Sequence, residues 1–198
     1  MWYGFYETIL NVKNTIITRL FYPNARLLRF PMYMRNRKRI SWGEGLTCGY
    51  NCRMECVSTK TGKCGSIQMG KNVKIGDNVH IASAEKVAIG NNVLMASHIF
   101  ISDLDHGNYA GENQTSPQIS PDVREIYAEP IHIGDNVWLG ENVVILKGVS
   151  IGNGCVIGAN SLVNKDIPEN SIAVGSPARV IKKYNFEHNT WENVNEKI

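Results

Sequence analysis

Residues 151–166, IGNGCVIGANSLVNKD, place Ile151, Ile157 and Val163 six positions apart. An α-helix repeats its apolar face every three or four residues and a β-strand every two, so a period of six requires a turn of higher order. The period extends backwards in a column of aliphatic residues: Ile133, Leu139, Ile145, Ile151, Ile157 and Val163. The chain therefore contains internal repeats, which must be identified before any single element.

A second column follows the first at a distance of four residues, and its members are apolar or small: Val137, Val143, Val149, Cys155, Ser161 and Ile167. The position before each of these is held mostly by residues that tolerate positive φ: Asn136, Asn142, Gly148, Gly154, Asn160 and Asp166. This pattern predicts a short strand, then a corner made by Asn or Gly, then another strand. Each repeat of six forms one side of a coil.

The same frame occurs upstream in two blocks, Met69, Ile75, Ile81 and Ile89, Met95, Ile101, with two extra residues near Val87 and Ala88. The frame is faint over 40–66, clear over 67–101 and regular over 133–168. At 198 residues, the chain is long enough for one domain with terminal additions. We expect an N-terminal segment over 1–39, helical and then extended. A repeat domain should follow over 40–175, and a C-terminal tail over 176–198. The segment 102–132 fits no repeat and is a long excursion loop, which is usually functional or disordered.

Several motifs resemble the hexapeptide-repeat acyltransferases. They are HIFISDLDHG, AEPIHIGDNVWLGENVVIL, RFPMYMR and the closing VGSPARVIKKYN, with Gly175, Pro177, Ala178, Arg179 and Ile181 in a G-x-P-A-R-x-I pattern. Over about residues 20 to 193, the chain resembles the lipopolysaccharide and capsule O-acetyltransferase branch, and also galactoside and maltose acetyltransferases. The resemblance implies an all-β fold: a left-handed parallel β-helix with an N-terminal helical segment and the excursion loop. The C-terminal tail or short helix would complete it.

The resemblance also implies direct transfer of an acetyl group from acetyl-CoA to a sugar hydroxyl of a surface polysaccharide or its lipid-linked precursor. An alcohol needs a base to become a nucleophile, and imidazole is the usual base at neutral pH. His106 matches the catalytic histidine of galactoside and maltose acetyltransferases, so we expect it to be the general base. Asp103 and Asp105 are candidates to orient it, as a backbone carbonyl would be. Many relatives have His-Asn where this chain has Leu104-Asp105.

By the same resemblance, the acetyl-CoA contacts are Trp138, Gly140, Ala159, Asn164, Lys165, Arg179 and Lys182. For Trp138 the alternative is subunit packing, and for each cation it is a solvated surface charge. Asn78 and His80 are candidate acceptor contacts on a coil like that of galactoside acetyltransferases. Acceptor specificity is expected from residues 102–132 and the N-terminal segment.

We expect no metal site. His80 and His98 are 18 residues apart, about one coil, but the two-residue insertion places them at different positions of their repeats, so they should not form a γ-carbonic-anhydrase-like zinc site. Cys48, Cys52, Cys56 and Cys64 lack the paired short spacing of structural zinc sites. The repeat frame places Cys48 and Cys52 in the aliphatic columns, which predicts core packing. The metal interpretation of this cluster is the alternative.

The N-terminal segment combines Trp2, Tyr3, Phe5 and Tyr6 with a basic cluster: Arg26, Arg29, Arg35, Arg37, Lys38 and Arg39. A terminal helix docked on the repeat domain explains this segment, and binding to anionic lipid is the alternative. Residues 1–22 contain no long uninterrupted apolar run and no cleavage site of small residues, so we expect a cytoplasmic protein, with membrane association at the inner face as an option. A net charge of +3 gives no reason to expect nucleic acid as a partner.

The resemblance further implies a homotrimer with active sites between subunits, in which His106 of one subunit faces the CoA-binding coil of its neighbour. N-acetylation of an amino sugar or a xenobiotic is the enzymatic alternative on the same scaffold. A β-helix that serves only as a scaffold or binding surface is the non-enzymatic alternative. A nucleotidyltransferase is excluded, since no strand followed by a Gly-rich phosphate loop opens the chain.

Overall fold

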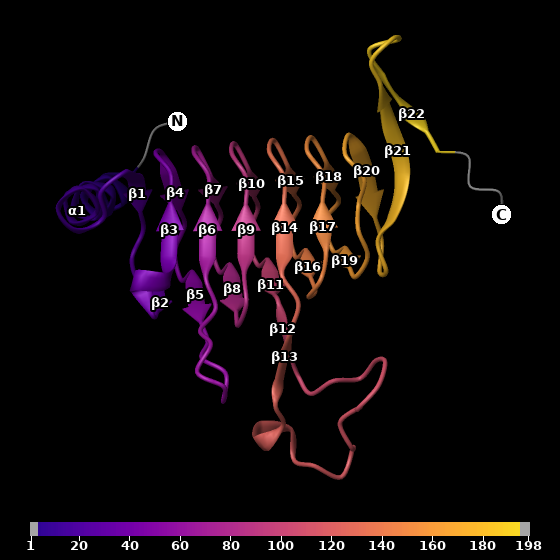
Figure 1. Ribbon diagram of the computed structural model, residues 1–198. Coiled ribbons are helices and arrows are strands. Elements are labelled where there is room, and N and C mark those ends of the chain that lie inside the picture. The colour runs from indigo at the N-terminus through magenta and orange to yellow at the C-terminus, as the bar shows by residue number, and fades with distance from the viewer. Residues whose placement is uncertain (1–3, 195–198) are drawn as a thin grey trace.

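The computed structural model describes residues 4–194 and has the shape of a three-sided prism (Figure 1). The chain winds through three parallel sheets in turn, so that successive strands lie on successive sides. Sheet 1 contains β1 (Ala25–Leu28), β4 (Leu46–Cys48), β7 (Lys74–Ile75), β10 (Leu94–Met95), β15 (Trp138–Leu139), β18 (Val156–Ile157) and β20 (Ser171–Val174). Sheet 2 contains β2 (Tyr33–Arg35), β5 (Arg53–Cys56), β8 (His80–Ser83), β11 (Phe100–Ser102), β16 (Val144–Ile145) and β19 (Leu162–Val163). Sheet 3 contains β3 (Ile40–Trp42), β6 (Ile67–Met69), β9 (Val87–Ile89), β14 (Ile131–Ile133) and β17 (Ser150–Ile151).

The register of these sheets reproduces the six-residue columns of the sequence. Met95 pairs with Leu139 and Leu139 with Ile157, one above the other along sheet 1. In sheet 2, Ile101, Ile145 and Val163 stack in the same way. Both columns are buried and form one continuous core along the prism. The predicted left-handed parallel β-helix is therefore confirmed, and its core is a stack of identical positions rather than a mixed interior.

The corners are made by the residue types that the sequence indicated. Positive φ occurs at the predicted corner positions Asn136, Asn142, Gly148, Gly154 and Asn160, where a short strand gives way to the next side. Asn side chains also link successive corners, as between Asn142 Nδ2 and Asn160 Oδ1 at 3.2 Å. The two extra residues fall at the corner after β8, so that the inward-facing Ile81 and Ile89 are eight residues apart instead of six.

The two ends of the prism differ from the repeat. Helix α1 (Phe5–Phe21) precedes β1 and packs against it. Strands β1 and β2 lie within the expected N-terminal segment of 1–39, yet they already pair in sheets 1 and 2 of the β-helix. Short 3₁₀ turns, η1 (Arg37–Arg39) and η2 (Pro121–Val123), lie before β3 and in the excursion loop. Across residues 4–194, no helix combines the length and apolarity needed to cross a membrane.

The C-terminal short helix predicted as one option is wrong. Residues after β20 form two antiparallel strands, β21 (Arg179–Asn185) and β22 (Thr190–Asn193), which extend sheet 1 by two positions. Exposure alternates along most of β21, the pattern of a half-covered strand. The hairpin covers the last parallel strand, whose backbone groups would otherwise be unpaired.

Candidate active site

An arm leaves the prism at the corner between sheets 2 and 3, where β11 should lead directly to β14 (Figure 1). It is built on two short antiparallel strands, β12 (Leu104–His106) and β13 (Ile126–Ala128). Asp105 pairs with Tyr127 and His106 with Ile126. The predicted excursion loop therefore carries His106 on a paired strand, and paired strands hold a side chain in position better than a free loop does.

Asp103 fastens the base of this arm to the preceding coil. Its carboxylate is fully buried and accepts hydrogen bonds from Ser83 Oγ at 2.7 Å, from the Ala84 amide at 2.6 Å and from the Glu85 amide at 3.1 Å. A buried carboxylate needs such a set of donors to offset its desolvation. Asp103 therefore binds the corner of the preceding coil, and its oxygens are occupied by partners other than His106.

Asp105 is engaged on the other side of the arm. Lys147, at the same corner one coil further on, lies 3.0 Å from Glu129 Oε1 and 3.5 Å from Asp105 Oδ2, and it faces the Tyr127 ring at 5.1 Å. Partial burial alone would lower the pKa of Lys147, but the two carboxylates outweigh it and the pKa is raised. Lys147 thus links the β-helix to both strands of the arm through charged contacts. No motif in the sequence marks this lysine.

His106 is exposed at the end of β12. Its backbone carbonyl accepts a hydrogen bond from the Tyr109 hydroxyl, which in turn accepts one from Arg124 Nη1 at 2.6 Å. Among residues 4–194, no hydrogen bond to its imidazole is formed, so neither Asp103 nor Asp105 orients the ring within one chain. The role of the two aspartates beside His106 stays a prediction, while the structure gives each of them another partner.

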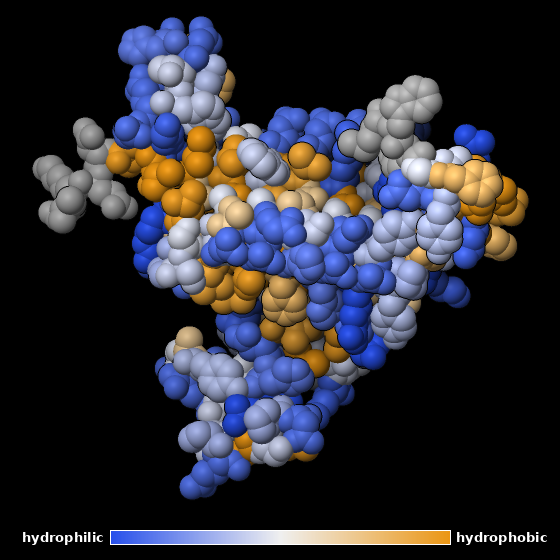
Figure 2. Space-filling model, turned by 180° about the vertical axis from the view of Figure 1, so that it is seen from behind, coloured by the Kyte–Doolittle hydropathy of each residue, from blue (hydrophilic) through white to orange (hydrophobic). Residues whose placement is uncertain are grey.

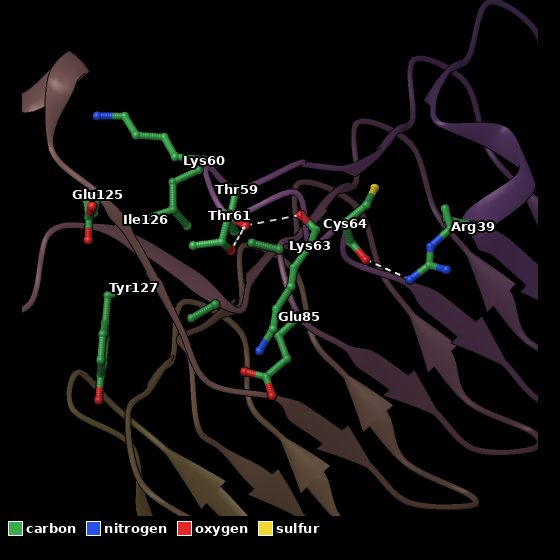
Figure 3. A pocket seen from close by; sticks show the side chains of 12 residues that line it. Arg39, Thr59, Lys60, Thr61, Lys63, Cys64, Glu85, Glu125, Ile126 and Tyr127 are labelled. Carbon is green, nitrogen blue, oxygen red and sulfur yellow. Dashed lines mark hydrogen bonds between the residues drawn. The ribbon is translucent and has the colours of Figure 1, made fainter.

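A polar cleft of about 560 Å³ lies beside the arm (Figure 3). One wall is β13 with Glu125, and the other is the β5–β6 loop with Thr59 and Lys63. Lys60 Nζ donates to the Val123 carbonyl at 2.8 Å and joins the two walls. In the part of the chain that the structure describes, His106 does not line this cleft, although its strand pairs with β13. The cleft is therefore adjacent to the candidate base and does not contain it.

Most of the predicted CoA contacts lie on the outer face of sheet 1 or at its edge. Trp138 is half-exposed, and its outward position continues through Val156 and Ile172 to Lys182 on β21. A bulge between Ile172 and Ala173 shifts the register of β21. As a result, Arg179 opposite Val174 and Lys182 opposite Ile172 share one face, although they are three residues apart.

The remaining predicted contacts divide between two corners. Gly140 and Ala159 stack at the corner between sheets 1 and 2, where a Cβ on Gly140 would stand 2.6 Å from the Ala159 amide nitrogen. Asn164 and Lys165 are exposed at the corner between sheets 2 and 3, the corner of the arm. One chain therefore has Trp138, Arg179 and Lys182 on the outer face of sheet 1 and Gly140 and Ala159 at the adjoining corner, and it places Asn164 and Lys165 across the width of sheet 2.

The predicted acceptor contacts are also separated. Asn78 lies at the corner between sheets 1 and 2 with φ 57°, and its amide is 3.1 Å from His98 Nε2 in the next coil. His98 also has positive φ and contacts Glu141 at 2.9 Å, so it occupies an Asn position of the corner ladder. His80 is on the outer face of sheet 2, beside the Phe100 ring at 5.3 Å. His80 and His98 do not stack.

A buried carboxylate that no sequence motif marks contacts His80. Glu55 is 4% exposed, and its carboxylate contacts His80 Nε2 at 3.1 Å, Arg53 Nε at 2.5 Å and Arg35 Nε at 3.3 Å. Burial alone would raise the pKa of Glu55, but the hydrogen bonds from Arg53 and His80 outweigh it and the pKa is lowered. Glu55 therefore fixes His80 on the sheet.

The cysteines pack as the repeat frame predicted. Cys48, Cys52 and Cys56 are buried in the core, and Cys64 is partly buried. Burial raises the pKa of Cys56 to about 11, which keeps that thiol protonated at neutral pH. Within residues 4–194, no three His, Cys, Asp or Glu side chains are grouped so as to hold a metal ion.

Comparison with known proteins assigns the chain to a family. Residues 130–165 match the model described as bacterial transferase hexapeptide (six repeats). WbbJ of Escherichia coli K12, named as an O-acetyl transferase of lipopolysaccharide biosynthesis, is 45% identical over 191 residues, which are 96% of this chain and 95% of WbbJ. The galactoside O-acetyltransferase of the same strain is 41% identical over 120 residues, 61% of this chain and 55% of that enzyme.

A solved structure confirms the fold. A single-residue variant of AntD, an N-acyltransferase from Bacillus cereus solved with dTDP-4-amino-4,6-dideoxyglucose and coenzyme A, superposes with a TM-score of 0.68 at 20% identity over 84% of each chain. The near-complete match to WbbJ, the repeat model and this superposition agree. The chain belongs to the hexapeptide-repeat acetyltransferases.

Proposed function

We propose that the protein transfers an acetyl group from acetyl-CoA to a hydroxyl of a sugar in a surface polysaccharide or its lipid-linked precursor. The observation that carries this proposal is the full-length similarity to WbbJ, whose name specifies O-acetyl transfer in lipopolysaccharide biosynthesis. His106 supports it, because the one imidazole on the projecting arm is exposed and free to meet a substrate. With acetyl-CoA as the donor, we place the reaction in the cytoplasm.

In the proposed reaction, His106 accepts the proton of the sugar hydroxyl while the hydroxyl oxygen attacks the thioester carbonyl. The carbon–sulfur bond then breaks, the acetyl ester forms on the sugar, and the thiolate of CoA takes up the proton. No nucleophilic side chain is needed, since the transfer is direct. Polar and charged groups of the cleft between β13 and the β5–β6 loop supply hydrogen bonds of the kind that carbohydrate hydroxyls need.

The assembly that we propose is a homotrimer with active sites between subunits. Within one chain, His106 leaves from the corner between sheets 2 and 3, whereas Gly140 and Ala159 lie at the corner between sheets 1 and 2. Sheet 2 separates these corners. A neighbouring chain that presents its CoA-binding corner to this arm would close the gap, and it would leave the isolated chain inactive. On this arrangement Asn164 and Lys165 would act across the same interface.

The decisive experiment measures release of CoA from acetyl-CoA with a panel of sugar acceptors, for the wild type and for His106→Ala. We expect the wild type to turn over an acceptor and the variant to lose roughly two to four orders of magnitude in kcat, with the same sedimentation coefficient. Equal activity would remove His106 from the reaction. Hydroxylamine releases acetate from an ester and not from an amide, so it separates O-acetylation from N-acetylation. Failure of CoA to bind would favour the scaffold alternative.

A further inference from the structure

Helix α1 is docked with its polar side inward. Asn14 and Thr18 are the buried residues of the helix, at 1% and 0% exposure. The Thr18 hydroxyl accepts a hydrogen bond from the Leu28 amide at 2.9 Å, and Asn14 Oδ1 accepts one from the Phe30 amide at 3.4 Å. A helix that serves only to cover a core buries its apolar face instead. The docked-helix prediction holds for the contact with β1, but the face that makes the contact is polar.

The opposite side of α1 carries an apolar stripe. Its members are spaced by four, three, four and four residues, which places them on one face of a helix, and they are between 50% and 85% exposed: Phe5, Ile9, Val12, Ile16 and Leu20. Thr18 follows Ile16 by two residues, about 200° around the helix axis, so the stripe points away from the prism. Figure 2 shows hydrophobic side chains gathered at the end of the molecule where α1 lies.

The basic side chains of α1 border this stripe, and its acidic side chain lies on the opposite side of the helix. Lys13 lies one turn after Ile9 and Arg19 three residues after Ile16, and both are exposed. Glu7 is the one acidic residue of the helix. It is seven residues before Asn14 and therefore on the docked side of the helix. Its carboxylate accepts a hydrogen bond from the Gly4 amide at 3.2 Å. The open face of α1 is apolar with a cationic border and no acidic residue.

We propose that α1 is an interfacial helix that binds the surface of an anionic lipid membrane through this stripe. An exposed apolar face bordered by cations fits acyl chains beneath anionic headgroups. A two-fold pairing of α1 with a second copy fits less well, because it would bring the Lys13 and Arg19 side chains of both copies together with no carboxylate between them. The spacing 4-3-4-4 also follows a straight helix rather than the alternating 4-3 of a coiled coil.

This inference goes beyond the proposed function and is tested apart from catalysis, by flotation of the full-length protein with lipid vesicles. With vesicles of phosphatidylcholine containing phosphatidylglycerol, we expect the wild type to float, and less of it to float at high salt or with phosphatidylcholine alone. Ile9→Glu and Ile16→Glu should each weaken partitioning at least about tenfold, since each places a charge where the proposed contact would bury an apolar group in the membrane. Lys13→Gln with Arg19→Gln should abolish the preference for phosphatidylglycerol.

Val123→Glu on the arm is the matched control, because it changes an equally exposed apolar residue far from α1 in sequence, and it should float like the wild type. Melting curves check that each variant is folded. The proposal is overturned if the wild type does not float or if Ile16→Glu floats equally well. It is also overturned if Ile16→Glu changes the sedimentation coefficient without lipid, since the stripe would then be a contact between protein chains. Flotation does not depend on acetyl transfer, so a failed catalytic proposal leaves this test intact.

Discussion

The buried carboxylate of Asp103 accepts a hydrogen bond from the Ser83 hydroxyl at 2.7 Å, and this contact ties the base of the arm to the corner of the preceding coil. Two backbone amides complete the set of donors. His106 follows Asp103 by three residues, so the position of the candidate base depends on an anchor that faces away from it.

Asp103→Asn should therefore behave as a change in stability before it behaves as a change in chemistry. An amide in place of the carboxylate turns one acceptor into a donor that faces other donors, and we expect the free energy of unfolding to fall by roughly 2–3 kcal/mol. Ser83→Ala removes one donor and should cost about 1 kcal/mol. Denaturant unfolding measures both. A variant with unchanged stability and an activity as low as that of His106→Ala would show instead that Asp103 acts on the imidazole.

Lys147→Met should loosen the arm without disturbing the prism. The variant keeps an unbranched side chain of similar length but loses the contacts to Glu129 and Asp105. We expect faster hydrogen exchange over residues 104–106 and 126–128 and a kcat lowered about tenfold. Lys147→Arg, which keeps the charge, is the control and should restore most of the activity. Unchanged exchange in the methionine variant would mean that the strand pairing alone holds the arm.

The repeat could be predicted because its physics is local and periodic. Ile145 is buried for the same reason as Ile151 and Ile157, and Asn142 and Asn160 turn corners by the same conformation, so one repeat predicts the next. The predicted columns were therefore confirmed where the frame was regular, and so were the predicted corners except Asp166, which does not have positive φ. The outward position of Trp138 follows from the same alternation, since it precedes the inward-facing Leu139.

Features that depend on contacts between coils could not be predicted in this way. Asp103 meets Ser83 across a corner that the two extra residues lengthen, so the frame alone does not place them together. Glu55 lies in the region where the frame is faint. The sequence of β21, RVIKKYN, does not alternate apolar and polar residues, so a tail or short helix was expected there, and a bulge lets this segment pair as a strand. The orientation of α1 depends on Asn14 and Thr18, whose burial requires backbone partners in β1 and just after it.

Glu55→Gln should remove an acid-sensitive part of the stability. The pKa of Glu55 is lowered in the folded protein, so its carboxylate stabilises the fold above the unfolded value of 4.5 and loses this contribution as the pH falls through the folded value. We expect the variant to be less stable by on the order of 1–3 kcal/mol at about pH 7. The difference should shrink below pH 4.5. Denaturant unfolding across this pH range measures it, and a difference that grows in acid would contradict the assignment.

Arg179 and Lys182 provide the sharpest test of the proposed CoA site, because the bulge in β21 places them on the face of Trp138 and places their neighbour Lys183 on the other. Lys183 pairs with Ser171, which is buried, whereas Lys182 pairs with the outward-facing Ile172.

If the cations bind the phosphates of CoA, Arg179→Ala and Lys182→Ala should each weaken CoA binding about five- to tenfold, the loss of one charged contact. Lys183→Ala should bind CoA like the wild type. Calorimetric titration with CoA and with dephospho-CoA, which lacks the 3′-phosphate, shows which phosphate each cation contacts. A variant that has lost a contact to the 3′-phosphate should bind CoA more weakly than the wild type does but bind dephospho-CoA equally well. If Lys182→Ala and Lys183→Ala weaken CoA binding equally, the two lysines act only through the general charge of the surface. The phosphates of CoA would then not bind on the outer face of sheet 1.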